Sequence, residues 1–342
     1  MKLFIIPLFL YISCILIFNK TMTYFRNSKL IDKPSERTNH IIPTPKGAGI
    51  ILIPLIIFSS GLVFFLNETL DLQWIIYFIC CLILLILSFL DDLKSLPSSI
   101  RLIFQFSCVG LCLFFLKNEI LFFSQNLQLL TILGLSPNFD FFIVTITLLL
   151  FWLWIINLFN FMDGMDGITS IQVIFLSLLV NSLTLLGYFS ENIQFLSIMM
   201  LASFLAFLNF NKPPAKIFLG DSGSIPVGFL CGLIIIKSIV EYNIFIPLLI
   251  ISMYYFLDSS LTLAIRFMKR KNIFIAHSEH FYQRVLRSGY SHSDVLFKIL
   301  ILSIFLFILS LLSINFKFIS LTIAFLITLI LIMYFFQKGK NE

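Results

Sequence analysis

Long runs of apolar residues recur along this chain and limit what it can fold into. One of them, FFIVTITLLLFWLWI at residues 141–155, carries no charged residue. A helix rises about 1.5 Å per residue, so about 20 apolar residues cross a bilayer core of about 30 Å. Only helices and closed barrels satisfy their backbone polar groups inside lipid, and runs of this length are typical of helices. The sequence therefore predicts an all-α, polytopic integral membrane protein with about ten or eleven transmembrane helices.

The runs themselves place the spans. We expect them at residues 2–18, 48–66, 73–90, 100–117, 141–158, 168–188, 193–210, 224–240, 245–264, 296–313 and 318–336. Composition agrees, because 59% of the residues are hydrophobic and 12% charged, whereas soluble domains are about half apolar and about a quarter charged. The first run lacks the small-residue cleavage site of a signal peptide, so we interpret it as a helix. No repeat or soluble-domain boundary interrupts the chain, and we expect residues 1–342 to form one membrane domain.

The positions of the basic residues predict the topology. Of the 23 Lys and Arg residues, all lie in the odd-numbered connections or the C-terminal tail except Lys2, Lys117, Lys237 and Lys317. Cytoplasmic loops carry the Lys and Arg excess, so we expect the N-terminus outside and the C-terminus inside. The net charge of +6 is then a topology signal that suits anionic lipid or nucleotide partners and argues against nucleic acid. All six cysteines lie within the spans, where buried thiols are the simplest interpretation.

One of the most hydrophobic runs ends in the polar stretch NLFNFMDGMDG, residues 157–167. Asn157, Asn160, Asp163 and Asp166 recur every three positions and so form a drifting stripe along one flank of a helix end. A glycine follows each Asp and lets the backbone approach a ligand. Helix capping is the alternative interpretation. Two Asp-Gly steps with two upstream amides exceed what a cap needs, and acids near a membrane are costly, so the pattern indicates function.

Further acids accumulate on the same predicted side. Asp91 and Asp92 end the third span, and adjacent carboxylates repel each other unless they share a cation or a proton. Asp221 stands in a Gly-Asp-Ser-Gly-Ser turn that opens the eighth span, where backbone N–H groups can face an anion. A solvated pair of acids and an ordinary capped helix start are the alternatives.

Two loops add donors and cations. The segment IDKPSERTNHIIPTPKGAG, residues 31–49, contains Arg37, His40, Thr44 and Lys46, and AHSEHFYQR contains His277, His280 and Arg284. Ordinary surface positions are the alternative for each. Five carboxylates and these groups, gathered at one face, indicate an anionic, metal-bound ligand. Mg²⁺ takes one or two carboxylates plus substrate phosphates, so phosphoryl transfer at the membrane surface is the expected chemistry, with Mn²⁺ as the alternative ion.

Five segments together carry a family resemblance. DKPSERTNHIIPTPKGAG, FLDDLKS, NLFNFMDGMDG, FLGDSGS and HSEH resemble, in order and spacing, the polyprenyl-phosphate N-acetylhexosamine-1-phosphate transferase family, glycosyltransferase family 4. Each segment alone is a weak signal, but five in the same order are specific and cover essentially the whole chain.

The resemblance implies a reaction and its partners. A sugar 1-phosphate would move from a UDP-N-acetyl sugar to undecaprenyl phosphate, releasing UMP and leaving a diphosphate-linked lipid that starts an O-antigen or related glycan. The protein would then lie in the bacterial inner membrane with its active site on the cytoplasmic face, in contact with membrane lipid. A homodimer is expected by analogy alone.

The resemblance also implies residue roles. Asp221 is the expected Mg²⁺ ligand with Asp92 as a second, and the catalytic set is Asp91, Asp92, Asp163 and Asp166. The substrate-binding set is Arg37, His40, Thr44, Lys46, Lys94, Asn157, Asn160, His277, His280 and Arg284. Asp91 is the candidate general base, although a lipid phosphate with a second pKa of about 6 is largely a dianion at neutral pH. Direct attack and a two-step route through an aspartyl phosphate both stay open.

The sugar and the class each leave alternatives. The ending HSEHFYQR resembles O-antigen initiators that take N-acetylglucosamine or 6-deoxy relatives such as N-acetylfucosamine or N-acetylquinovosamine. A phospho-N-acetylmuramoyl-pentapeptide transferase is the alternative within the family. An ion-coupled transporter would place its acids near mid-bilayer, and a lipid-binding scaffold would need neither the paired Asp nor the Gly-Asp turn.

Overall fold

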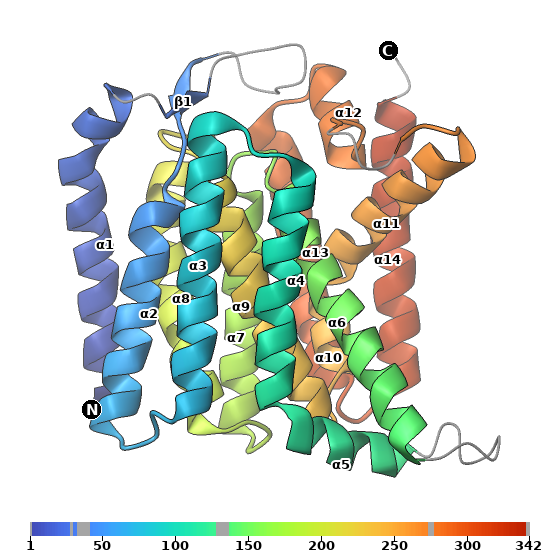
Figure 1. Ribbon diagram of the computed structural model, residues 1–342. Helices are drawn as coiled ribbons and strands as arrows, with labels where there is room; N and C mark the ends of the chain where they lie inside the picture. Colours follow the sequence, from blue (N-terminus) through green and yellow to red (C-terminus); the bar gives the residue numbers. More distant parts are fainter. Residues whose placement is uncertain (1, 28–29, 33–41, 128–136, 273–276, 340–342) are drawn as a thin grey trace.

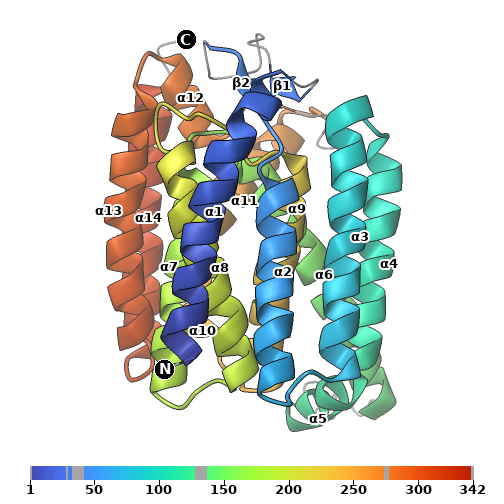
Figure 2. The ribbon, with the colours of Figure 1, turned by 90° about the vertical axis from the view of Figure 1, so that its left-hand side faces the viewer.

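The computed structural model is a bundle of long helices that run roughly alongside one another (Figures 1 and 2). It describes residues 2–27, 30–32, 42–127, 137–272 and 277–339. The elements are α1 (Lys2–Arg26), β1 (Ile31–Asp32), β2 (Thr44–Pro45), α2 (Gly49–Leu66), α3 (Leu72–Lys94), α4 (Ser98–Phe115), α5 (Lys117–Leu127), α6 (Pro137–Met162), α7 (Ile168–Leu185), α8 (Glu191–Asn211), α9 (Asp221–Val240), α10 (Ile246–Ile251), α11 (Met253–Met268), α12 (Phe281–Arg287), α13 (His292–Leu312) and α14 (Lys317–Lys338).

The expected all-α membrane architecture is confirmed. Within the described residues, 10 helices are long and apolar enough to cross a membrane, namely α1 to α4, α6 to α9, α13 and α14. The first is longer than the expected 2–18, because it continues to Arg26. The described strands form a two-residue antiparallel ribbon, in which Ile31 pairs with Pro45 and Asp32 with Thr44. Its position at the end of the bundle brings the loop before α2 over the ends of the helices (Figure 2).

The expected span at 245–264 is not one continuous helix. It is divided at Ser252, whose φ of −97° and ψ of 4° interrupt the helical backbone between α10 and α11. The six residues of α10 extend only about 9 Å, too short to cross the membrane. Hydropathy alone misses such a break, because Ser252 is neither Pro nor Gly. Helix α11 then runs obliquely toward the end of the bundle that carries α12 (Figure 1).

Helix α9 forms the centre of the bundle and is almost entirely buried. It packs against α2, α3 and α6. A Cβ added at Gly228 would lie 2.9 Å from Ile156 Cα of α6, and the Trp152 indole N–H donates to Phe229 O over 3.0 Å. Small residues let membrane helices approach this closely. The close packing fixes the N-terminus of α9, and with it Asp221, in the middle of one end of the bundle.

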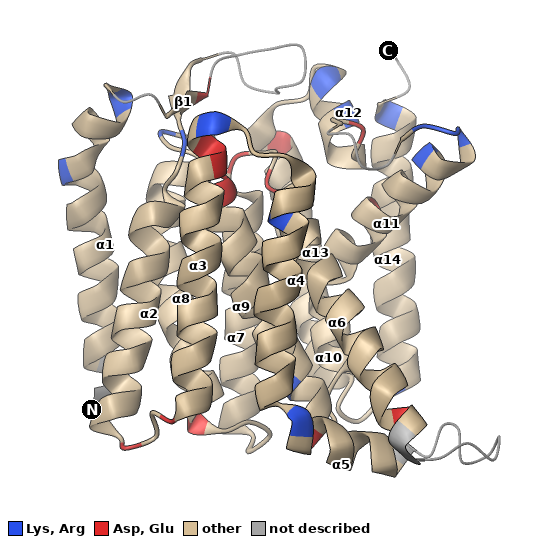
Figure 3. Ribbon diagram, viewed as in Figure 1, with Lys and Arg blue, Asp and Glu red and all other residues tan. Residues whose placement is uncertain are grey.

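Charged residues are distributed unequally between the two ends of the bundle. Figure 3 shows most Lys and Arg at the end that carries β1 and α12, with acidic residues gathered among the helix ends there. This arrangement agrees with the clustering expected from the sequence. Which side of the membrane this end faces stays a prediction.

Candidate functional site

A cavity of about 230 Å³ lies at this charged end of the bundle. Its lining comes from the ends of α3, α6, α8, α9 and α13, from the β1–β2 segment, from the turns after α6 and before α9, and from α12. The lining residues are Asp32, Lys46, Asp92, Asn160, Asp163, Gly164, Met165, Asp166, Asn211, Phe218, Leu219, Gly220, Asp221, Gln283 and His292. Segments far apart in the sequence therefore converge here, as expected for the acids.

Asp92 holds the turn that opens α9. Its Oδ2 accepts the Ser222 N–H over 3.0 Å, and its Oδ1 accepts the Asp221 N–H over 3.4 Å. Lys46 Nζ lies 3.1 Å from the same Oδ1. A carboxylate at a helix N-terminus satisfies N–H groups that lack partners and favours the helix dipole. Asp92, with a side chain only 2% exposed, therefore organises the Asp221 turn.

Gly220 makes this turn possible. Its φ is +74°, a conformation that glycine adopts without steric cost. A Cβ there would stand 2.9 Å from Gly47 N and 3.0 Å from Asp92 Oδ2. The glycine of the Gly-Asp step is thus required by backbone conformation and by the approach of the neighbouring loop.

Lys46 is a charged member of the cavity wall. Burial lowers the pKa of its ammonium, but Asp92, followed by Asp221 and Asp32, outweighs this effect and raises the pKa above its ordinary value. Its backbone is also fixed, since Lys46 N–H donates to Leu30 O over 2.8 Å. Lys46 therefore brings a fixed positive charge to the acids.

Arg101 of α4 links two of the acids. Its NH1 lies 2.9 Å from Asp91 Oδ2 and 3.4 Å from Asp221 Oδ2. Asp91 Oδ1 also accepts the Leu96 N–H. The Asp91 side chain is 7% exposed and that of Asp221 is 36% exposed. Asp221 is therefore the carboxylate of this group that a ligand reaches most readily.

The fifth-span stripe is divided by the structure. Asn160 Nδ2 donates to Asp221 Oδ1 over 3.0 Å and to Ser224 Oγ over 3.1 Å. Asn157 Nδ2 instead donates to Gln105 Oε1 over 2.9 Å and to Leu153 O over 2.8 Å. Positions three apart on a helix differ by about 60° in direction, so a stripe at this spacing does not stay on one face. Asn160 faces the acids, and Asn157 ties α6 to α4.

The two aspartates of the stripe also differ. Burial raises the pKa of Asp163 well above its ordinary value, and the nearby carboxylates of Asp221 and Asp92 raise it further. A hydrogen bond with Thr169 lowers the pKa but does not outweigh these effects. Asp166 is buried, and its Oδ2 accepts the Ala215 N–H over 3.0 Å while its Oδ1 lies 3.2 Å from His292 Nδ1. Asp163 thus lines the cavity in surroundings that favour its neutral form, an effect that a bound cation would oppose, whereas Asp166 clamps the α6–α7 turn to neighbouring segments.

The remaining expected residues have different surroundings. Arg37 and His40 lie outside the described residues. Thr44 is buried in β2 and donates to Ile42 O over 3.0 Å. Lys94 is exposed at the end of α3. Of these, the structure gives Thr44 a local structural contact and leaves Lys94 outside the cavity lining.

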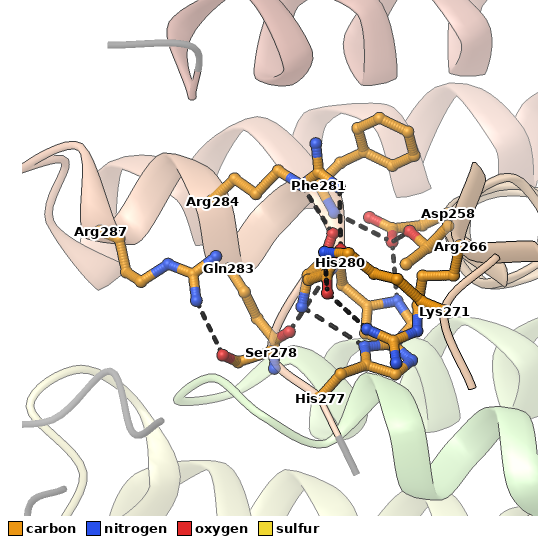
Figure 4. Close-up of polar contacts among 12 residues, drawn as sticks. Asp258, Arg266, Lys271, His277, Ser278, His280, Phe281, Gln283, Arg284 and Arg287 are labelled. Atoms are coloured by element: carbon orange, nitrogen blue, oxygen red, sulfur yellow. Dashed lines mark hydrogen bonds and ion pairs between the residues drawn. The ribbon is translucent and has the colours of Figure 1, made fainter. Parts of the chain in front are cut away.

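Figure 4 shows the polar contacts of the His-containing loop and the start of α12. His280 Nδ1 lies 3.0 Å from Asp258 Oδ1, and Arg284 Nε donates to Glu279 O over 2.8 Å. Burial, then the electrostatic influence of His280 and Arg266, lower the pKa of His277 to about 4. Among the described residues, Gln283 of α12 lines the cavity, whereas His277, His280 and Arg284 do not.

The side chains that line the cavity suit a hard cation only if a phosphate ligand supplies further oxygen atoms. Within the described ranges, no group of three or more His, Cys, Asp and Glu side chains could hold a metal ion. Mg²⁺, however, typically takes one or two protein carboxylates and completes its shell with water and phosphate oxygens. Asp221 and Asp163 line one cavity and offer carboxylate oxygens, so the residues present suit such an ion.

Comparison with known proteins shows a family similarity. Residues 74–239 match the model of Glycosyl transferase family 4. The match spans just under half of the chain, and the chain is similar to glycosyl transferase family 4. The matched region of this chain contains the Asp91–Asp92 pair, the NLFNFMDGMDG stretch and the Asp221 turn, so the family resemblance expected from the motifs is confirmed.

Individual relatives of this chain are phosphosugar transferases by name. It is 26% identical over 313 residues to a probable undecaprenyl-phosphate N-acetylglucosaminyl 1-phosphate transferase of Bacillus subtilis (strain 168), which covers 89% of this chain and 82% of that protein. It is 36% identical over 112 residues to a phospho-N-acetylmuramoyl-pentapeptide-transferase of Streptococcus suis (strain 05ZYH33), covering 32% of each. A protein of that name from Prochlorococcus marinus is 30% identical over 203 residues, with 54% of this chain and 52% of that protein covered.

Some residues of the candidate site were missed by sequence reasoning. From the sequence, Arg101 was used only to predict the membrane topology, and Gln283 and His292 were given no role. Arg101 follows the Asp91–Asp92 pair closely, which was a usable signal. Asp258 lies within an expected span, and an acid at such a position indicates a specific role by itself.

Proposed function

We propose that this membrane transferase moves an N-acetylhexosamine 1-phosphate from a UDP-linked sugar to undecaprenyl phosphate. The observation that carries the proposal is the position of Asp221, partly exposed at the cavity between Asn160 and Arg101. Carboxylates alternate with two cations, Lys46, which lines the cavity, and Arg101, which is not among the lining residues but pairs with Asp91 and Asp221. Such an alternation suits a diphosphate that arrives with a divalent cation. The names of the relatives support the same reaction class.

In this proposal Asp221 and Asp163 hold Mg²⁺, with Mn²⁺ as the alternative. The ion, when bound, neutralises the diphosphate charge and so stabilises the transferring phosphoryl group. Asp92, the other expected ligand, already accepts two backbone N–H groups and pairs with Lys46. We therefore assign Asp92 to orienting the Asp221 turn.

The chain's own residues do the positioning. Arg101 and Lys46 balance the carboxylates and offer positive charge to phosphate oxygens, while Asn160 orients Asp221. The acceptor phosphate, largely a dianion at neutral pH, forms a bond to the sugar-linked phosphorus as the bond to UMP breaks. Asp91, engaged by Arg101 and by Leu96 N–H, is poorly placed to remove a proton. Direct attack is therefore preferred to a base-assisted or aspartyl-phosphate route.

The sugar is proposed to be N-acetylglucosamine or a 6-deoxy relative such as N-acetylfucosamine or N-acetylquinovosamine. The support is the match to the Bacillus subtilis protein, which extends over most of both chains. Transfer of phospho-N-acetylmuramoyl-pentapeptide is the second candidate, favoured by the shorter matches of higher identity. The first candidate implies a start to O-antigen or another envelope glycan at the cytoplasmic face of the bacterial inner membrane. A homodimer stays a prediction.

Transfer of radiolabel tests the proposal. Purified protein in detergent is given undecaprenyl phosphate and a panel of UDP-N-acetyl sugars that includes UDP-N-acetylmuramoyl-pentapeptide, with MgCl₂ or EDTA. We expect metal-dependent labelling of lipid by one donor, lost in Asp221→Asn. Asp71→Asn is the matched control, because Asp71 caps α3 at its other end by accepting the Trp74 N–H. If no donor labels the lipid, and the folded protein binds no UDP-sugar, the result would favour the alternative function of an ion-coupled transporter.

A further inference from the structure

Asp258 is a fully buried acid that the proposed reaction does not use. It lies on α11 with an exposed fraction of 0%, beside the cavity but not among its lining residues. Burying a carboxylate is costly unless its oxygens are well hydrogen-bonded. The surroundings of this carboxylate therefore indicate what it is for.

Both oxygens of Asp258 hold the start of α12 (Figure 4). Oδ1 lies 3.0 Å from His280 Nδ1 and accepts the Phe281 N–H over 3.2 Å. Oδ2 accepts the Tyr282 N–H over 3.4 Å and the Tyr254 hydroxyl over 3.2 Å. Because the first N–H groups of a helix have no partner within the helix, this carboxylate anchors α12 to α11.

The contact with His280 also fixes the state of the imidazole. A carboxylate can only accept, so His280 Nδ1 carries a hydrogen. The ring stacks on His277, with centroids 5.1 Å apart, and lies near Phe161, at 6.2 Å. Asp258 and the neighbouring rings therefore hold the position and the plane of the imidazole, in the way that a carboxylate orients a catalytic or metal-bound histidine elsewhere.

The anchored segment reaches the acidic turn of the cavity. The Tyr282 hydroxyl donates to Phe161 O over 3.2 Å and accepts the Gly164 N–H over 3.1 Å. Gly164 follows Asp163, and a Cβ on it would stand 2.4 Å from the Tyr282 hydroxyl oxygen and 2.7 Å from Gln283 Nε2. The turn after α6 and the first turn of α12 are thus fitted directly to each other.

From these contacts we infer that Asp258 is a positioning residue of the transferase. This inference rests on the proposed function. It sets the proton of His280 on Nδ1 and docks α12, so that Tyr282 and Gln283 hold the turn of Asp163 and Gly164 at the cavity. An asparagine cannot replace it. One amide oxygen would replace two carboxylate oxygens, and the NH₂ group would face N–H donors.

Activity measurements test the inference first. Asp258→Asn should lower kcat for sugar-phosphate transfer about tenfold or more, as is usual when the residue that orients a functional histidine is lost. Asp258→Asn combined with His280→Gln should be little worse than His280→Gln alone, since residues that act through one another are not additive. Ser259→Ala is the matched control, because this buried α11 neighbour makes none of these contacts; its kcat should stay within about twofold of wild type.

Hydrogen–deuterium exchange gives a readout independent of activity. Asp258→Asn should exchange faster than wild type at residues 277–289 and also at residues 160–167, whereas Ser259→Ala should match wild type in both. If Asp258→Asn does not fold, Tyr282→Phe removes only the hydroxyl link and should speed exchange at residues 160–167.

The outcomes separate the two proposals. Active wild type with unchanged kcat in Asp258→Asn, or additive effects in the double variant, would overturn the positioning role and leave the proposed function standing. Unchanged exchange at residues 160–167 would overturn it as well. A wild type that transfers nothing, with the expected exchange pattern, would refute the function while supporting the Asp258 link.

Discussion

Arg101 NH1 lies 3.4 Å from Asp221 Oδ2, and so a cation of the chain occupies one face of the carboxylate proposed to hold the metal. The same nitrogen lies 2.9 Å from Asp91 Oδ2. Arginine and a divalent cation would each favour the ionised form of Asp221, and both approach the same group. Their competition for this carboxylate has a measurable consequence.

Arg101→Gln should strengthen the response to metal while weakening catalysis. Without the guanidinium, Asp91 and Asp221 lose their shared cation, so added MgCl₂ should raise the thermal unfolding midpoint more than it does in wild type. Transfer activity should fall about tenfold or more, because a positive charge beside the diphosphate is lost. Thermal unfolding in detergent with and without MgCl₂ measures the first effect. An equal metal-induced shift in the two proteins would show that Arg101 does not compete for the site.

Gly49→Ala should destabilise the protein through a direct backbone clash. A Cβ on Gly49 would lie 2.2 Å from Gly223 Cα, where the loop before α2 crosses the start of α9. Neither backbone can yield without moving the Asp221 turn, and overpacking of this kind costs about 1–3 kcal/mol or more. Gly110→Ala is the control, since its Cβ would meet Leu149 Cδ1 at an ordinary 3.9 Å. The yield of monodisperse protein and the unfolding midpoint should fall for Gly49→Ala alone.

Much of the fold could be predicted from the sequence, because the bilayer sets the length of every span. Hydropathy located the helices, but it missed the break at Ser252, where the backbone leaves the helix without Pro or Gly. It also missed α5, a helix with a Lys and an acid in its first turn that lies outside the apolar runs. A membrane helix can be apolar on all faces, so its sequence does not show which face packs against which neighbouring helix. The packing of α9 could therefore be seen only in the structure.

The candidate site was predictable to the level of segments and less so to the level of side chains. Asp92, Asp163 and Asp221 were expected together, and all three line the cavity. The regular spacing of Asn157 and Asn160 suggested one role, yet their side chains have different partners. The hydrogen bonds of Asp92 to two N–H groups of α9 depend on a crossing between distant segments that no local pattern encodes.

Asn160→Leu should impair catalysis more than stability. The substitution keeps the approximate volume but removes the donor to Asp221 Oδ1 and to Ser224 Oγ. The Asp221 carboxylate would lose its orientation, and we expect kcat to fall about tenfold, within the range found when a positioning hydrogen bond is removed. Asn181→Leu is the matched control, because Asn181 Nδ2 makes similar bonds to Ser177 O and Ser197 Oγ away from the cavity. Similar losses of kcat in both variants would point to a general effect of losing a partly buried amide.

His277 should make the protein less stable as the pH falls from about 6.5 to about 4. Its pKa is lowered to about 4 in the folded protein, by burial first and then by His280 and Arg266, against about 6.5 in an unfolded chain. Above this window both states are neutral at His277. Within it the unfolded chain takes up a proton that the folded protein refuses, so folding loses at most about 3 kcal/mol, less where water screens the half-buried ring.

Thermal unfolding midpoints between pH 7.5 and 4.5 measure this effect. His277→Gln cannot take up the proton, so its midpoint should fall less steeply than that of wild type below pH 6.5, while the difference between the two should stay constant above that pH. Glu279, whose pKa is lowered by Lys271, Arg266 and Arg284 against the opposing effect of burial, loses stabilisation only at more acidic pH, below about 4.3. Parallel curves for the two proteins between pH 6.5 and 4.5 would therefore exclude His277 as the source of the acid sensitivity.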